Sequence, residues 1–277
     1  MTELTVGGLE RTFTIQPPSR ESVPLVLVLH GADGTGSMMR EWTSFDRQAQ
    51  AWGWAVAYPD GYERGWADGR GVKAADAAGI DDVGFLRTLI DWSAQRYGTL
   101  PDRTVVAGSS NGAFMAHRLA LQASDQVAVL AAVAGGMPAT WRDFEPTHAV
   151  SALLIHGTAD KLAPIDGGHS RHRGPNGELR GRMLSLQETT ERWRAVDRCP
   201  AGPGEPYVTE FSSRTTAKGG VGGSRVAAWT VLGGGHTWPG ASVLPEWSEP
   251  TTQEFDAAKE ICRFAQTLLI PADARRL

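Results

Sequence analysis

One short segment has the composition that a reactive serine requires. Residues 108–112 read Gly-Ser-Ser-Asn-Gly, a match to the pattern Gly-x-Ser-x-Gly with Ser110 at its centre. The segment follows the apolar residues 105–107 and precedes a predicted helix, which is the strand–turn–helix setting in which this pattern holds a nucleophile. The glycines are needed because the turn is sharp and larger side chains beside the serine would clash. Ser109 occupies a variable position of the pattern, so the sequence favours Ser110.

A serine hydroxyl is a poor nucleophile at neutral pH, so Ser110 needs a histidine base that a carboxylate orients. On turns of this kind the acid follows the serine in the chain and the histidine follows the acid. The acid is expected in a loop after a strand, and His-Gly-Thr-Ala-Asp at 156–160 closes the predicted strand 152–156. Asp160 is therefore the favoured acid, and Asp166 is the alternative.

The histidine that takes the proton of Ser110 is expected after this acid. Three of the seven histidines meet that condition, and they are His169, His172 and His236. His236 lies in a glycine-rich loop directly after the predicted strand 226–232, from which its side chain can reach the serine. His169 and His172 lie in a basic, polar segment and are expected to be exposed to solvent. His236 is therefore the favoured base.

The negative charge that develops on the oxygen of an attacked ester carbonyl needs two backbone N–H donors. One is expected from Asn111, the residue after the serine, at the positive N-terminal end of the predicted helix. The other is expected from residues 30–34, the loop after the first long strand, where Ala32 is the favoured donor and Gly31 the alternative. The sequence thus predicts the nucleophile, base, acid and oxyanion hole that acyl transfer requires.

A scaffold must bring these loops together, and the chain alternates predicted strands and helices. Residues 24–29 are a continuous apolar run, which is typical of a strand buried on both faces of a parallel sheet. Residues 81–97 have helical periodicity, with Asp81 and Asp82 at the start, where carboxylates cap a helix. We expect one α/β domain over 1–277, with a mostly parallel central sheet and helices on both faces. Further strands are predicted at 4–6, 11–15, 54–58, 103–107, 126–134, 152–156, 206–211 and 226–232, and further helices at 38–51, 113–122, 183–197 and 254–269.

Three segments fall outside this alternation. Residues 167–182, rich in arginine and glycine, and residues 212–224, rich in glycine and serine, are predicted to be solvated loops. A lid or a substrate rim is the alternative for both. In the segment Trp-Ala-Asp-Gly-Arg-Gly at 66–71, Asp68 and Arg70 are expected to pair and so to stiffen the loop.

Composition excludes several other classes of protein. The chain of 277 residues has 27 Lys and Arg against 31 Asp and Glu, a net charge of −4, which argues against a nucleic-acid binder. The longest apolar run, residues 127–134, is far shorter than the roughly 18 residues of a membrane span. The first residues lack the basic start and apolar core of a secretory signal. A cytoplasmic location is expected if Met1 is the natural start, and a secreted one if a leader has been removed.

The cysteine count and the spacing of possible ligands indicate neither a metal nor an organic cofactor. Two cysteines, Cys199 and Cys262, are too few for a zinc cluster or a disulfide framework. They are expected to be ordinary thiols, with a disulfide between them as the alternative. There is no His-x-x-x-His pair and no glycine-rich dinucleotide turn after the first long strand.

Several further motifs follow one another in a distinctive order. Their sequences are Leu-His-Gly at 29–31, Tyr-Pro-Asp-Gly at 58–61, Trp-Ala-Asp-Gly-Arg-Gly at 66–71, Asp-Asp-Val-Gly-Phe-Leu at 81–86, the serine segment at 108–120, His-Gly-Thr-Ala-Asp at 156–160 and Gly-Gly-Gly-His-Thr-Trp-Pro-Gly at 233–240. Together they resemble the polyhydroxybutyrate-depolymerase-like esterases of the α/β-hydrolase superfamily, which include feruloyl and acetylxylan esterases of carbohydrate esterase family 1. The resemblance runs from about residue 20 to residue 265.

This resemblance implies a serine carboxylesterase with an α/β-hydrolase fold and with Ser110, Asp160 and His236 as its triad. It also implies that Trp66 and Trp238 lie near the mouth of the active site, where they would contact the substrate together with Gly31. For Trp66, a position in the core is the alternative. The usual tryptophan motif has an asparagine at the position of Ala67, so any contact from that asparagine is missing in this chain.

The function expected from these observations is hydrolysis of a carboxylic ester through an acyl-enzyme. The partner would be a small or oligomeric ester of the short-chain, aromatic (feruloyl-type) or hydroxyalkanoate class. An acyltransferase would use the same triad and differ only in whether an alcohol or water removes the acyl group. A non-catalytic binding module on the same fold is a further alternative, although such modules commonly lose a triad residue and this chain keeps all three candidates.

Overall fold

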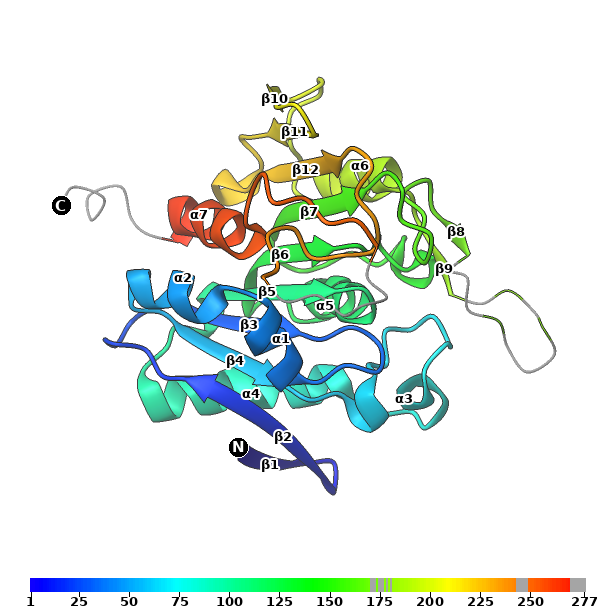
Figure 1. Ribbon diagram of the computed structural model, residues 1–277. Helices are drawn as coiled ribbons and strands as arrows, with labels where there is room; N and C mark the ends of the chain where they lie inside the picture. The colour runs from blue at the N-terminus through cyan, green and yellow to red at the C-terminus, as the bar shows by residue number, and fades with distance from the viewer. Residues whose placement is uncertain (170–172, 174–176, 178, 180, 243–248, 270–277) are drawn as a thin grey trace.

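A central sheet of ten strands organises the described part of the chain. The structure, a computed structural model, describes residues 1–269 except 170–172, 174–176, 178, 180 and 243–248. The strand order is β1-β2-β4-β3-β5-β6-β7-β12-β11-β10 (Figure 1). Its strands are β1 (Thr2–Val6), β2 (Leu9–Gln16), β3 (Leu25–Leu29), β4 (Ala55–Pro59), β5 (Thr104–Ser109), β6 (Val127–Val133), β7 (Ser151–Gly157), β10 (Glu205–Val208), β11 (Ser212–Ala217) and β12 (Val226–Val231).

The middle of the sheet is parallel, as the sequence predicts. Strands β4, β3, β5, β6, β7 and β12 run in one direction, while β1 with β2 and β10 with β11 add antiparallel edges. Every residue of β3, β4 and β7 is buried, which explains the continuous apolar sequences of β3 and β4 and the apolar centre of β7. The loops that follow the parallel strands therefore meet at one edge of the sheet, on the right in Figure 1.

Helices cover both faces of the sheet, which confirms the predicted α/β architecture. Helices α1 (Gly36–Trp42), α2 (Phe45–Trp52) and α7 (Ala257–Leu269) lie on one face and share one apolar core with it. Helices α4 (Asp82–Tyr97), α5 (Asn111–Gln122) and α6 (Leu186–Val196) lie on the other face and share the second core. A short helix α3 (Ala74–Ala77) and a small hairpin of β8 (Gly168–His169) and β9 (Arg182–Met183) complete the elements. None of the helices in the described ranges is long and apolar enough to cross a bilayer.

Several predicted segments differ from the structure. The helix predicted from 254 begins at Ala257, and the strand predicted to end at 211 ends at Val208. The helix predicted at 38–51 is two helices, because Thr43 is extended and its hydroxyl donates to the carbonyl of Met39, 2.7 Å away. The helix predicted from 183 begins only at Leu186, after Ser185, which forms a capping box with Glu188. The predicted loop 212–224 begins with a strand, β11, which pairs antiparallel with β12.

The two cysteines are free thiols. Cys199 is half-buried, and Cys262 lies on the buried face of α7, where burial raises the pKa of its thiol to about 12. The disulfide alternative is therefore wrong, and Cys262 packs as a small apolar residue.

A buried ion pair joins the N-terminal hairpin to helix α4. Asp81 caps this helix by accepting a hydrogen bond from the amide of Gly84. Asp82 was predicted to share that role, but its carboxylate is fully buried and accepts a 2.6 Å hydrogen bond from Nη2 of Arg11 on β2. The Arg11 guanidinium also stacks on the ring of Phe85. The pair therefore fixes the edge of the sheet to the start of the helix.

We expect Arg11→Leu to lower the free energy of unfolding by about 3–5 kcal/mol, because it leaves the Asp82 carboxylate buried without its cation. Urea denaturation followed by circular dichroism measures this loss. Arg20→Leu is the matched control, since Arg20 is exposed and such surface changes usually shift stability by less than about 0.5 kcal/mol. Equal stabilities of the two variants would contradict a structural role for the pair.

Candidate active site

Ser110 lies on a strained turn between β5 and α5. Its backbone angles are φ 54° and ψ −120°, a conformation that non-glycine residues rarely adopt. A Cβ at Gly108 would lie 2.2 Å from the carbonyl oxygen of Gly112, and a Cβ at Gly112 would lie 2.3 Å from that of Leu29. Both glycines are therefore required for this turn, as the sequence pattern predicts.

The structure brings Asp160 and His236 together. Asp160 follows β7 and His236 lies in the loop after β12, and these two strands are parallel neighbours. The Nδ1 atom of His236 lies 2.8 Å from Oδ2 of Asp160. The other carboxylate oxygen accepts hydrogen bonds from the amides of Leu162 and Ala163.

The alternative acid, Asp166, is exposed, and the alternative base His169 lies exposed in β8. His172 lies outside the described residues.

The surroundings of Asp160 favour its ionised form. Burial by itself would raise the pKa of this carboxyl group, but hydrogen bonds from His156 and His236 outweigh burial and hold the pKa well below its usual range. The carboxylate is thus available to orient the His236 imidazole and to stabilise its charged form. His156 was not predicted to have a role. Its Nε2 atom lies 3.3 Å from Oδ2 of Asp160 and 2.7 Å from the carbonyl oxygen of Ala163.

The loop at residues 30–34 is held against the serine. Nε2 of His30 accepts a hydrogen bond from the amide of Gly61 at 2.8 Å, so Nδ1 carries the proton and donates to the carbonyl of Gly31 at 2.7 Å. Burial lowers the pKa of His30, which favours this neutral tautomer. A Cβ at Gly31 would lie 3.4 Å from Cβ of Ser110, so the loop backbone closely approaches the nucleophile. Ala32 follows on the same loop and lines the cavity above it.

Trp66 is not at the mouth of the site, contrary to the expectation from the resemblance. Its side chain is completely buried in the core beneath the sheet edge. The indole Nε1 donates to the carbonyl of His30 at 2.9 Å, and the backbone amide donates to Oδ1 of Asn111 at 2.8 Å. Trp66 therefore contacts the two segments that carry the predicted oxyanion donors, at His30 and at Asn111. It does so from the core and does not line the cavity.

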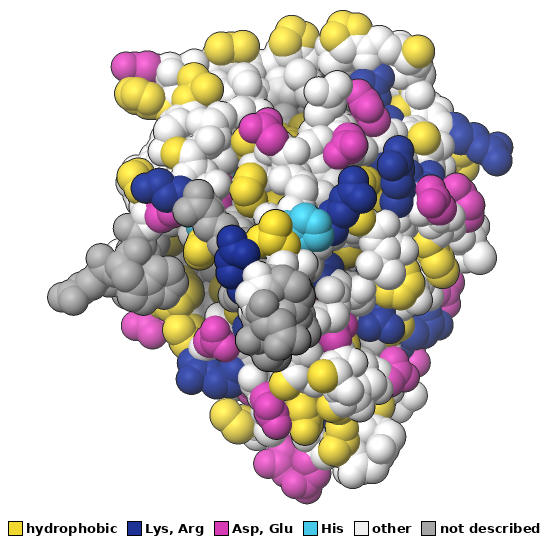
Figure 2. Space-filling model, turned by 90° about the vertical axis from the view of Figure 1, so that its right-hand side faces the viewer, with side chains coloured by type: hydrophobic (Ala, Val, Ile, Leu, Met, Phe, Trp, Pro, Cys, Tyr) yellow, Lys and Arg dark blue, Asp and Glu magenta, His cyan; other side chains and the backbone are white. Residues whose placement is uncertain are grey.

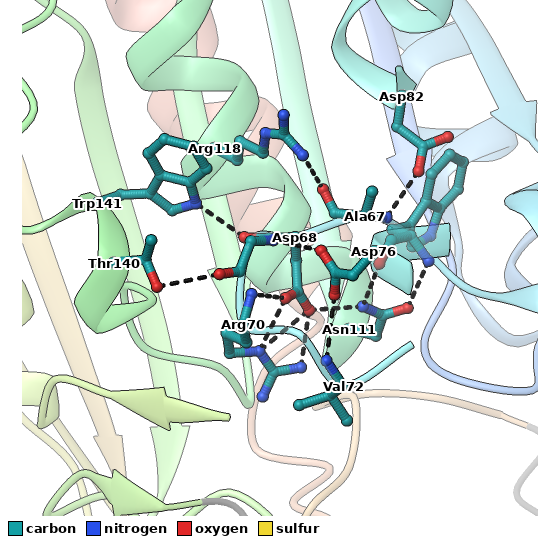
Figure 3. Close-up of polar contacts among 12 residues, drawn as sticks. Ala67, Asp68, Arg70, Val72, Asp76, Asp82, Asn111, Arg118, Thr140 and Trp141 are labelled. Atoms are coloured by element: carbon teal, nitrogen blue, oxygen red, sulfur yellow. Dashed lines mark hydrogen bonds and ion pairs between the residues drawn. The ribbon is translucent and has the colours of Figure 1, made fainter. Parts of the chain in front are cut away.

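The side chain of Asn111 is anchored to the same segment. Its amide nitrogen donates to the backbone carbonyl of Trp66 at 3.2 Å and to Oδ2 of Asp68 at 2.7 Å (Figure 3). Asp68 is fully buried and pairs with Arg70, whose Nη2 lies 2.7 Å from Oδ2, which confirms the predicted pair. Asp76 accepts from the amide of Gly69 and adds a further support to the segment. The residue after the nucleophile is thus held by three groups of residues 66–68: the backbone N–H and carbonyl of Trp66 and the carboxylate of Asp68.

Ser110 and His236 line a common cavity of about 320 Å³. Trp238 forms part of its wall and is 5% exposed, while Trp66 lies outside it. The cavity opens on the molecular face to which the parallel strands lead, where Lys and Arg side chains lie on either side of a histidine (Figure 2). Its other lining residues include Gly31, Ala32, Met38, Met39, Trp42, Arg70, Lys73, Asn111, Phe114, Leu162, Ala163 and Ala241.

In the ranges that the structure describes, no group of three or more His, Cys, Asp or Glu side chains is placed to hold a metal ion. The serine, the acid–histidine pair and the backbone amides around them are the reactive groups identified at this cavity.

Comparisons with known proteins identify the family of the chain. A family model described as "Putative esterase" matches residues 6–201. The chain is 32% identical over 259 residues to "Putative esterase NocK" of Nocardia uniformis subsp. tsuyamanensis, covering 87% of this chain and 74% of that protein. It is 26% identical over 157 residues, 56% of the chain, to the bifunctional acetylxylan esterase/xylanase XynS20E of Neocallimastix patriciarum, of which it spans 22%. The solved acetyl xylan esterase of Aspergillus awamori superposes with a TM-score of 0.59 at 16% identity, covering 85% of this chain and 93% of that chain.

The fold is that of the α/β-hydrolases, and the comparisons define the class of protein as an esterase. The chain belongs to the esterase family whose model it matches, and it is a serine hydrolase of carboxylic esters.

We expect Asp160→Asn to lower kcat by about 10⁴-fold, because an amide in place of the carboxylate would hold the His236 imidazole in the wrong tautomer. Steady-state hydrolysis of 4-nitrophenyl acetate measures the loss. Asp166→Asn serves as the control and should keep normal turnover. If Asp166→Asn is the inactive variant, the acid has been assigned to the wrong residue.

We expect Asn111→Ala to lower kcat with little change in KM. The backbone amide remains, but without the side-chain hydrogen bonds to residues 66–68 it is no longer fixed in place. Because an oxyanion donor acts mainly in the transition state, its misplacement reduces kcat, by up to about 10²–10³-fold for complete loss of one donor. Kinetics with a 4-nitrophenyl ester measure both constants, and a change confined to KM would contradict the prediction.

Proposed function

We propose that Ser110, His236 and Asp160 are the catalytic triad of this esterase. The observation that carries the proposal is the 2.8 Å hydrogen bond between His236 and Asp160 beside the strained turn that presents Ser110 to the same cavity. A strained serine turn and an oriented histidine are the two features that activate a hydroxyl nucleophile.

The proposed reaction proceeds in two stages. Ser110 Oγ attacks the ester carbonyl while His236 takes its proton, and the backbone amides of Asn111 and Ala32 stabilise the resulting oxyanion. The intermediate collapses, the alcohol leaves with the proton returned by His236, and an ester of Ser110 remains. Water, activated by His236, then attacks this acyl-enzyme and releases the carboxylic acid and free Ser110.

We propose an ester with a short acyl chain as the substrate. A cavity of about 320 Å³ lies at the small end of the range for ligand sites, and Met38, Met39, Trp42 and Trp238 give it apolar walls. Two of the similar proteins, those of Neocallimastix patriciarum and Aspergillus awamori, are named as acetylxylan esterases. This favours an acetyl group over a long acyl chain. Aromatic, feruloyl-type and hydroxyalkanoate esters are the other members of the proposed class.

We expect Ser110→Ala to lower kcat by about 10³–10⁶-fold, since it removes the nucleophile and leaves only the binding groups. A panel of 4-nitrophenyl acetate, butyrate and octanoate, methyl ferulate, acetylated xylan and a hydroxybutyrate oligomer would measure this loss and rank the substrates. Ser109→Ala is the matched control, because Ser109 also lines the cavity but lies at the end of β5; it should remain active.

Near-normal turnover by Ser110→Ala would overturn the triad. Preference for octanoate over acetate would overturn the short-chain assignment. Products formed with an added alcohol separate ester hydrolysis from transfer, because transfer gives a new ester and hydrolysis gives only the acid.

A further inference from the structure

The cavity above Ser110 contains two cationic side chains that ester hydrolysis does not require. They are Arg70, from the segment that anchors Asn111, and Lys73, three residues further along the chain. Both are largely buried, with side-chain exposures of 3% for Arg70 and 15% for Lys73. Burying cations in the wall of a mostly apolar cavity costs free energy unless they have partners.

The guanidinium of Arg70 is only partly satisfied. Its Nε and Nη2 atoms donate to the carboxylate of Asp68 at 2.7–3.1 Å, and its planar face lies 3.4 Å from the ring centroid of Phe114. The remaining nitrogen, Nη1, is buried and has no hydrogen-bond partner within the described part of the chain. An unsatisfied donor of a buried guanidinium is costly, and a ligand oxygen would remove that cost.

Among the described residues, the ion pair of Lys73 is a weak one. Its ammonium nitrogen lies 3.5 Å from Oδ1 of Asp33, a side chain that is 82% exposed. Such an exposed pair contributes little attraction and can be exchanged for another anion. Lys73 is therefore available to a negatively charged group that enters the cavity.

Both cations line the same cavity as Ser110 and His236. Arg70 and Asn111 donate to the same oxygen of Asp68, and Asn111 is the neighbour of Ser110 (Figure 3). Phe114, on which the guanidinium stacks, lies one helical turn after Ser110 on α5 and also lines the cavity. A substrate whose ester carbonyl meets Ser110 thus has its next few atoms beside Arg70.

We propose that Arg70 and Lys73 form a carboxylate subsite, so that the preferred substrate is an ester that also bears a carboxylate group. This inference rests on the proposed function of the same cavity. A planar carboxylate can accept a hydrogen bond from Nη1 of Arg70 while it interacts with the Lys73 ammonium group. Asp68 stays paired on the other edge of the guanidinium, so binding requires no rearrangement of the segment that holds Asn111.

Two pairs of matched esters test this proposal. Monomethyl glutarate and methyl 4-carbamoylbutanoate differ by a carboxylate against an amide on the acyl side. The pair 4-acetoxybenzoate and 4-acetoxybenzamide makes the same change on the alcohol side. We expect wild type to prefer the acid over the amide by at least about 10-fold in kcat/KM for one pair, and the pair that responds locates the carboxylate.

Arg70→Gln should reduce this acid-to-amide ratio by about 10- to 100-fold, mainly through KM. Arg70→Lys keeps a cation beside Asp68 but removes the planar fork, and it should also lower the ratio. Lys73→Gln should lower the ratio by a smaller factor. Arg64→Gln is the matched control, because Arg64 is exposed and does not line the cavity; its ratio should equal that of wild type.

A wild-type ratio near one for both pairs would overturn the subsite, and so would a preference that survives in both Arg70 variants. If Arg70→Gln does not fold, the wild-type ratio, Arg70→Lys and Lys73→Gln still decide the question. Hydrolysis of the amide esters by wild type, abolished in Ser110→Ala, would show that the proposed function stands even where the carboxylate subsite fails.

Discussion

The position of the Asn111 side chain is the constraint on which the site depends. It is 1% exposed and hydrogen-bonds to both backbone groups of Trp66 and to the carboxylate of Asp68. Trp66 in turn donates its indole N–H to the carbonyl of His30. One buried segment therefore holds both the turn after β5 and the loop after β3, which are the two sources of the proposed oxyanion donors. Donors fixed before the reaction need no reorganisation when charge develops, and this is the main advantage of such a site.

That segment depends on the edge of the fold for its own position. The amide of Ala67 donates to Asp82 at 2.7 Å, and Asp82 is held by Arg11 from the N-terminal hairpin. The carbonyl of Ala67 accepts from Arg118 on α5, and the carbonyl of Asp68 accepts from the indole of Trp141 (Figure 3). Strand β2, two helices and a distant loop thus converge on residues 66–68. Elements that carry no catalytic group therefore still control the geometry at Ser110.

The sequence predicts what depends on local pattern. The parallel strands follow from continuous apolar runs, and Ser110, Asp160 and His236 follow from short motifs at the ends of strands. It does not predict contacts that depend on distant partners. Trp66 was expected near the mouth because nothing local shows that its indole reaches His30, 36 residues away. Asp82 had the local features of a helix cap. Its ion pair with Arg11 depends on the packing of β2 against α4, which the local sequence does not show. Strand β11 was missed because its residues are serine, threonine and arginine, and pairing with β12 outweighs their weak apolar pattern.

The charge beside Asn111 explains why Asp68 and Arg70 occur as a pair. A lone carboxylate bonded to Asn111 would repel an oxyanion forming at the neighbouring amide and so would slow the reaction. Arg70 contacts both oxygens of Asp68, which nearly cancels that charge while leaving the hydrogen bond to Asn111 intact. Asp160 must keep its charge, because in the proposed mechanism that charge stabilises protonated His236. Its other partners are the amides of Leu162 and Ala163 and the side chain of His156, and none of them is an Arg or Lys. The protein thus neutralises the carboxylate beside the proposed oxyanion hole and preserves the charge of the one behind the proposed base.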